Sequence, residues 1–202
     1  MVCISMEGRG IFNRQKRKRI VIALIIALIS IVTTASLYKH VRAESQNDIF
    51  INQNGKEVSL SDFNGKVVLM DFIQAECPRR GCNLLSLQFL KVQLLLKNRI
   101  GKDLFLLSVS IEPETDSPEI LKTYAEKYKA DPNGWFFLTG ANKAIERLMK
   151  KYGVTWVELK DGSLSHKTIT VLLDRQERLV NTYINPQADA EAIIRDIRAI
   201  ID

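Results

Sequence analysis

Residues 66–83 read K-V-V-L-M-D-F-I-Q-A-E-C-P-R-R-G-C-N and contain the pattern that decides the fold. Residues 66–72 form a mostly apolar, β-branched run, which is typical of a strand buried on both faces. Residues 83–97 are rich in leucine at helical spacing and predict a helix. The sequence therefore predicts a strand and a helix joined by a short segment that contains Cys77 and Cys82.

Strands and helices continue to alternate after this segment. Ser117, Pro118 and Glu119 are typical of a helix start, with a capping side chain, a proline in the first turn and an acid at the positive end of the helix dipole. Alternation that ends in a strand pair and a last helix predicts an α/β fold with a central sheet flanked by helices. The other expected strands are residues 104–111, 135–138, 168–174 and 178–183, and the other expected helices are residues 117–129, 142–152 and 187–201.

The basic charge of the chain is confined to its beginning. The 202 residues have a net charge of +6, but residues 1–43 alone carry eight bases and one acid. The remaining residues are almost neutral, with one acid in excess of the bases. A globular part without a basic stripe argues against a nucleic-acid-binding protein.

The charged residues of the amino-terminal part flank an apolar run. Residues 20–38 contain no charge, and as a helix they would span roughly 28 Å, which is close to the thickness of a bilayer core. Four bases at residues 16–19 precede the run, so the positive-inside rule places residues 1–19 in the cytoplasm. The alternative is a cleaved signal peptide that ends at Ala43.

Either alternative exports the rest of the chain. In a bacterium, the anchored form would lie in the inner membrane as a single-pass protein, with its main domain in the periplasm, where thiols meet oxidants. We expect a basic cytoplasmic tail at residues 1–19, a transmembrane anchor at 20–38, a polar tether at 39–54 and a folded domain at 55–202. Cys3 would remain on the cytoplasmic side.

The two cysteines of the expected domain are the clearest candidates for chemistry. Cys82 lies next to the expected helix start, where the helix dipole and the nearby Arg79 and Arg80 would stabilise a thiolate. A thiolate attacks disulfides and binds soft metals, so the pair could be redox-active or hold a metal. A structural disulfide is the simpler alternative. The one histidine of this domain, His166, comes just before an expected strand and could be a ligand or an ordinary surface residue.

Several blocks in the same order resemble the Sco/SenC family of copper-binding assembly factors for cytochrome c oxidase. The Cys77-Pro78 pair opens a motif like the family's C-P-x-x-C-P, and His166 stands where the family has its ligand histidine. The resemblance covers most of residues 50–200. The other matching blocks are G-K-V-V-L-M-D-F at 65–72, S-V-S-I-E-P-E-T-D-S-P-E at 108–119 and Y-A-E-K-Y-K-A-D-P-N-G-W-F-F-L-T-G at 124–140.

The resemblance implies a thioredoxin-like fold that binds one copper. The implied ligands are Cys77, Cys82 and His166, and the two cysteines are also the implied redox-active thiols. Asp116 and Glu112 match acidic positions of the family and are expected as supporting residues. The implied partners are the copper-site subunit of a cytochrome oxidase, a copper-donor chaperone or thiol reductant, and the membrane through the amino-terminal helix.

The cysteine motif departs from the family pattern in two places. Four residues separate Cys77 from Cys82, where the family has three, and Asn83 replaces a proline. In a continuous helix, positions five apart are 140° from eclipsed, so the two sulfurs could not share a metal. We therefore expect Cys77 in a loop before the helix, with Gly81 accommodating the extra residue.

Other chemistry finds less support in the sequence. A periplasmic thiol–disulfide oxidoreductase or redox sensor that uses Cys77 and Cys82 is the main alternative, although none of the five prolines lies near His166, where such enzymes keep a cis-proline. A peroxiredoxin is disfavoured, because Gln74-Ala75-Glu76 stands where that class has the start of its T-x-x-C motif. The chain has neither a glycine-rich phosphate loop nor a G-x-S-x-G elbow, and a zinc site of two cysteines and one histidine remains open.

Overall fold

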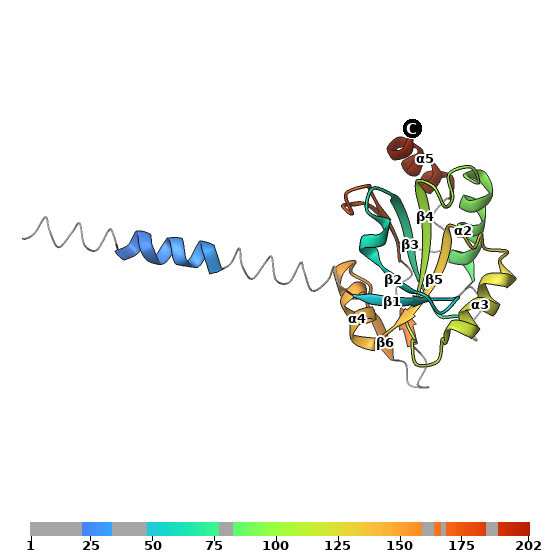
Figure 1. Cartoon of the computed structure of the whole chain (residues 1–202), viewed down its shortest axis with the longest axis horizontal. Coiled ribbons are helices and arrows are strands. Elements are labelled where there is room, and N and C mark those ends of the chain that lie inside the picture. The colour runs from blue at the N-terminus through green and yellow to red at the C-terminus, as the bar shows by residue number, and fades with distance from the viewer. Residues whose placement is uncertain (1–21, 34–47, 77–82, 159–163, 167–168, 185–189) are drawn as a thin grey trace, which may run out of the picture. The chain divides into compact units, whose positions relative to one another are not determined.

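The computed structural model describes residues 22–33, 48–76, 83–158, 164–166, 169–184 and 190–202 (Figure 1). The chain divides into two units, Met1–Glu44 and Ser45–Asp202. In the first unit, residues 22–33 form a helix. None of the helices in the described ranges has both the length and the apolar character needed to cross a bilayer. The ends of the expected anchor at 20–38 lie outside these ranges.

A seven-stranded sheet organises the second unit, in the order β2-β1-β5-β4-β3-β8-β9. The three central strands β3, β4 and β5 are parallel, whereas β1 and β8 run antiparallel to their neighbours in the centre. The strands are β1 (Ile49–Asn52), β2 (Glu57–Ser59), β3 (Val67–Ile73), β4 (Leu104–Ser110), β5 (Trp135–Gly140), β8 (Ile169–Leu173) and β9 (Leu179–Ile184). A separate antiparallel pair is formed by β6 (Trp156–Glu158) and β7 (Leu164–His166).

Helices cover both faces of the sheet, as the sequence predicts. One face packs against α2 (Leu84–Leu95), α3 (Pro118–Lys127) and α5 (Ala190–Ile201), around the buried Trp135 and Phe137. The other face packs against α4 (Asn142–Lys151) and the short 3-10 helix η1 (Leu60–Phe63). Figure 1 shows α2 and α3 on one side of the sheet and α4 on the other. All seven side chains of β3 are buried, which explains why its sequence is nearly continuously apolar.

The local signals at the helix ends are confirmed. The Ser117 side chain accepts a hydrogen bond from the backbone N–H of Ile120, and Pro118 is the first residue of α3. Helix α4 ends before Gly153, which has φ +70, a conformation that glycine adopts without strain. The expected strand pair near the carboxyl end is β8 and β9, which pair antiparallel.

The structure differs from the expected tether at residues 39–54. Residues 49–52 form β1, which pairs with both β2 and β5 and buries Phe50. The strand was not recognised in the sequence because only one of its two buried side chains, Phe50, is apolar, and the other is Asn52. His166 comes shortly before β8, as expected, and is also the last residue of the short strand β7, which was not expected.

The different burial of two neighbouring residues of β1 predicts that their substitutions affect stability very differently. Phe50 is 1% exposed and Ile49 is 47% exposed. We expect Phe50→Ala to lower the free energy of unfolding by about 3–5 kcal/mol, because it leaves a cavity in the core. Ile49→Ala should change it by about 0.5 kcal/mol or less. Urea unfolding of both variants measures this, and equal effects would show that β1 is not part of the stable core.

Candidate functional site

The predicted ligands are only partly within the described residues. Cys77 and Cys82 lie outside them, between Glu76 and Asn83. For His166 the backbone is described, and it pairs with Trp156 in the β6–β7 hairpin. The predicted grouping of the three side chains therefore stays a prediction. What the structure does show is how the two ends of the cysteine segment are held.

The end before Cys77 is held by Asp116. This carboxylate is fully buried, and its Oδ2 accepts hydrogen bonds from Ser110 Oγ at 2.5 Å and from the backbone N–H of Ala75 at 3.2 Å. Ser110 Oγ in turn accepts from the backbone N–H of Glu112 at 3.0 Å. Asp116 thus connects the end of β4 to the residue two positions before Cys77.

Acidic side chains gather around this connection. Gln74 Nε2 donates to Glu112 Oε2 at 2.8 Å, which links the residues that follow β3 and β4. Burial raises the pKa of Asp116, the hydrogen bonds from Ser110 and Ala75 lower it, and the charges of Glu112 and Glu76 raise it further. Asp116 and Glu112, expected as supporting residues, therefore lie at the flank of the cysteine segment. Gln74 was missed, because nothing in the sequence distinguishes it from other surface glutamines.

The end after Cys82 is the start of α2. Asn83 is the N-cap residue and Leu84 the first helical residue, so Cys82 precedes the helix. Asn83 makes no side-chain capping hydrogen bond. Its side chain therefore does not occupy the first backbone N–H groups of α2, which can donate to other acceptors. In the first turn, Ser86 Oγ lies 2.9 Å from the hydroxyl of Tyr124 on α3, which fixes α2 against α3.

A second buried carboxyl, Asp71, lies within β3 on the face covered by α2, α3 and α5. It is fully buried, and neither of its oxygens has a hydrogen-bond partner of normal geometry among the described residues. Burial raises the pKa of Asp71 to about 7, and the neighbouring Ser108 hydroxyl lowers it by less. The sequence signal is an acid in the middle of an apolar strand, V-V-L-M-D-F-I.

The family assignment comes from comparison with known proteins. The family model described as SCO1/SenC matches residues 43–202. A curated relative, the SCO1 protein homolog of Bacillus subtilis, is 30% identical over 154 residues, which cover 74% of this chain and 79% of the relative. The chain belongs to the SCO1/SenC family.

Two solved structures of SCO1/SenC relatives share the fold. One is BsSco, whose structure carries the description "a disulfide switch" and "a member of the Sco family of cytochrome c oxidase assembly proteins". It is 29% identical, has a TM-score of 0.65 and covers 76% of this chain and 90% of its own. The other is Bradyrhizobium japonicum ScoI with copper bound, 25% identical, with a TM-score of 0.60, covering 76% of this chain and 96% of its own. The expected thioredoxin-like fold is confirmed.

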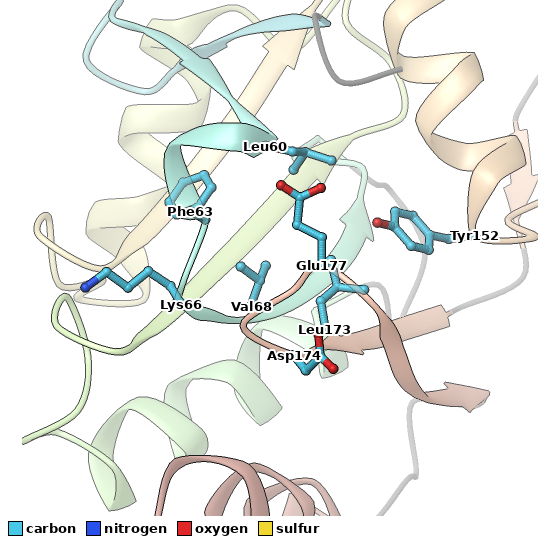
Figure 2. Close-up of a pocket in the computed structure, with 8 residues that line it drawn as sticks. All are labelled: Leu60, Phe63, Lys66, Val68, Tyr152, Leu173, Asp174 and Glu177. Atoms are coloured by element: carbon cyan, nitrogen blue, oxygen red, sulfur yellow. The ribbon is translucent and has the colours of Figure 1, made fainter. Parts of the chain in front are cut away.

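A pocket at the other end of β3 is separate from this SCO1/SenC site. It is lined by Leu60, Phe63 and Val68, and Figure 2 shows the Tyr152 hydroxyl and the Glu177 carboxylate directed into the same space. Both polar groups contain a buried atom without a hydrogen-bond partner among the described residues. The pocket leaves only about 10 Å³ for the centre of a water molecule, so it has room for about one water and not for a substrate.

The buried Asp71 predicts an unusual dependence of stability on pH. Its pKa is about 7 in the folded chain against 3.8 for an ordinary aspartate. Between these values the folded protein retains a proton that the unfolded chain has lost, so its contribution to stability falls as the pH rises from about 4 to 7. The full loss is roughly 4 kcal/mol. We expect Asp71→Asn to remove this dependence. The free energy of unfolding of the variant should therefore rise relative to that of the parent as the pH rises, which urea unfolding at several pH values measures.

Asp196→Asn provides a control whose effect on stability should change with pH in the opposite direction. Hydrogen bonds from Tyr183 and Asn181 lower the pKa of Asp196, so its contribution is present above the ordinary pKa and is lost as the pH falls. Asp196→Asn should therefore lower the free energy of unfolding, relative to the parent, most strongly at neutral pH. A stability difference between Asp71→Asn and the parent that does not change with pH would contradict the account of Asp71.

Proposed function

We propose that this protein binds one copper ion through the thiolates of Cys77 and Cys82 and the imidazole of His166, and that it delivers copper to the copper site of a cytochrome oxidase. The observation that carries the proposal is the SCO1/SenC match over residues 43–202, which includes all three residues. A copper-bound relative and a relative named as an oxidase assembly protein support it. In this role the protein is a metallochaperone, and copper is its cargo.

The donor set fits this cargo. Two thiolates and an imidazole are ligands that suit Cu(I), and they permit Cu(II) in a distorted geometry. Thiolates are favoured before a helix N-terminus, where the dipole is positive and the first backbone N–H groups are free. Cys82 directly precedes the N-cap residue Asn83, which makes no capping bond of its own. The residues next to the segment therefore favour the ionised form that copper requires.

The unusual cysteine spacing is compatible with a shared metal. The objection to four intervening residues applies to a continuous helix, in which the two sulfurs would point in different directions. Helix α2 begins at Leu84, so both cysteines precede it. Asp116 fixes the other end of the segment through Ala75. With Cys77 in a loop before α2, as the sequence predicts, the segment would bring both side chains to one ion.

A thiol–disulfide function of Cys77 and Cys82 is the second candidate. The observation in its favour is the disulfide switch named for BsSco, a relative that is 29% identical to this chain. In that function the cysteines would keep the thiols of an oxidase copper site reduced, or sense the redox state of the periplasm. It needs the same two cysteines but not His166, so the histidine separates the two candidates.

The amino-terminal part would attach this domain to a membrane. The helix at residues 22–33 exposes eight large apolar side chains, from Ile22 to Val32. With residues 20–38 as an anchor and the basic residues 16–19 in the cytoplasm, the copper-binding domain faces the periplasm of a bacterium. The tether would end where β1 begins. This arrangement places the domain beside membrane-bound oxidases, with a copper-donor chaperone or thiol reductant as a further partner.

Copper titration of reduced variants tests the ligand set. The full chain carrying Cys3→Ser would be loaded with Cu(I) in detergent against a competing chelator. We expect one copper per chain, and at least about tenfold weaker binding after Cys77→Ser, Cys82→Ser or His166→Ala, because each removes one ligand. His40→Ala is the matched control and should leave the affinity unchanged.

Two results would count against the copper proposal. If His166→Ala binds copper as tightly as the parent, the imidazole is not a ligand. If the parent binds no copper but forms and loses a Cys77–Cys82 disulfide readily, the thiol–disulfide function is the better account.

A further inference from the structure

Helix α2 is apolar on its outer side as well as on its inner side. The inner side packs in the core, where the ring of Phe89 lies 5.8 Å from that of Trp135. On the outer side, Leu87, Leu94 and Leu95 are 46%, 65% and 49% exposed. Figure 1 shows α2 at the periphery of the domain. A helix that is apolar around its whole circumference is normally buried on all sides, so the outer side of α2 is expected to contact a further surface.

The other helices of the domain follow the usual pattern. Helices α3, α4 and α5 bury apolar side chains on one side and expose polar or charged side chains on the other. Among the described helices of Ser45–Asp202, α2 alone exposes large apolar side chains. Exposed apolar residues that gather in one patch indicate an interaction surface, whereas scattered single residues do not.

The outer side of α2 has the spacing of a coiled-coil seam. At intervals of three, four and three residues, this α2 seam consists of Leu84, Leu87, Lys91 and Leu94. Such a repeat packs against a second helix, whose side chains fit between its own. The one charged member, Lys91, forms an ion pair with Glu191 of α5 at 2.9 Å. The α2 seam and its paired charge are therefore neutral together, which favours an apolar helix as the partner.

We propose that the α2 seam is a dimer interface, in which it packs against the α2 seam of a second copy of this chain. The proposal goes beyond the copper function and uses no residue of the cysteine segment. Leucines around one neutralised charge match the same surface on another copy, as a two-fold interface requires. A lipid surface fits less well, because helices that lie on anionic membranes have a polar side rich in lysine and arginine.

The size of the α2 seam predicts a weak dimer. Helix α2 has 12 residues and is about 18 Å long. One pair of such helices buries less than the roughly 800 Å² per partner of a standard stable interface, so association in dilute solution should be weak. Under the proposed function, the anchor at residues 20–38 confines the copies to one membrane and raises their effective concentration. The dimer is therefore expected on membranes.

Chemical crosslinking of the full chain in liposomes tests the dimer. The liposomes would contain phosphatidylethanolamine, and the reagent would be a short amine-specific crosslinker. Lys91 lies near the middle of α2, so a two-fold axis there brings the Lys91 side chains of the two copies close together. We expect mass spectrometry to identify a crosslink from Lys91 to Lys91, which can only join two chains. The double variant Leu87→Gln with Leu94→Gln should lower its yield at least about tenfold, because it removes two apolar contacts from each copy.

A matched variant separates the α2 seam from other exposed apolar residues. Leu179 and Ile184 on β9 are 52% and 54% exposed. The double variant Leu179→Gln with Ile184→Gln therefore removes a similar apolar surface from the same domain and should leave the crosslink unchanged. The single variants Leu87→Gln and Leu94→Gln should each give a smaller loss, so the test does not depend on the folding of one protein.

Four results would overturn the dimer. An equal crosslink in the parent and in the double variant of α2 would mean that the anchor alone brings the chains together. Loss of the crosslink in the β9 variant would place the interface on β9. A link from Lys91 to phosphatidylethanolamine, without a link between chains, would make the membrane the occupant. The absence of any Lys91 crosslink would leave the α2 seam without a partner.

The dimer and the proposed function can fail separately. The copper titration does not depend on the crosslink, because no copper ligand lies in the α2 seam. If the chain does not insert into liposomes, the anchor proposal fails. The same crosslinking in solution at high protein concentration then decides the dimer, with the same variants and the same expected losses.

Discussion

The rest of the structure depends on the burial of β3 between β4 and β8. This strand is covered on both faces and pairs in parallel with β4, so its direction and its end point are fixed by the core. The cysteine segment follows directly from that end. The hydrogen bond from Ile111 N–H to the Ile73 carbonyl and the contacts of Asp116 extend the order of the sheet to Ala75. The residues that lead into the cysteine segment, up to Ala75, are therefore held by a packed strand.

The sequence predicted the features that arise from local patterns. The apolar run of β3, the capped start of α3 and the glycine after α4 each depend on a few neighbouring residues, and each is confirmed. Strand β1 was missed because its place in the sheet depends on pairing with β2 and β5, which are distant in sequence. For the same reason the acidic position of Asp116 was expected, but its hydrogen bonds to Ser110 and Ala75 were not.

The buried polar groups of the domain are of two kinds. Some have partners, as Gln53 does with the backbone of Trp135 and Phe137. Others contain a buried atom without a hydrogen-bond partner in the described part of the chain, among them Asp71, Asp116, Tyr152 and Glu177. Departures from good packing and polar satisfaction concentrate at functional sites, where chemistry compensates for lost stability. Of these groups, Asp116 accepts a hydrogen bond from the backbone N–H of Ala75, two residues before Cys77.

The most direct test of the central claim is X-ray absorption spectroscopy of the copper-loaded, reduced protein. If Cys77, Cys82 and His166 share one ion despite the longer spacing, the copper environment will contain two sulfur ligands and one nitrogen ligand, and the nitrogen will be lost in His166→Ala. A copper environment of sulfur alone, or one that is identical in the parent and in His166→Ala, would contradict the three-ligand site.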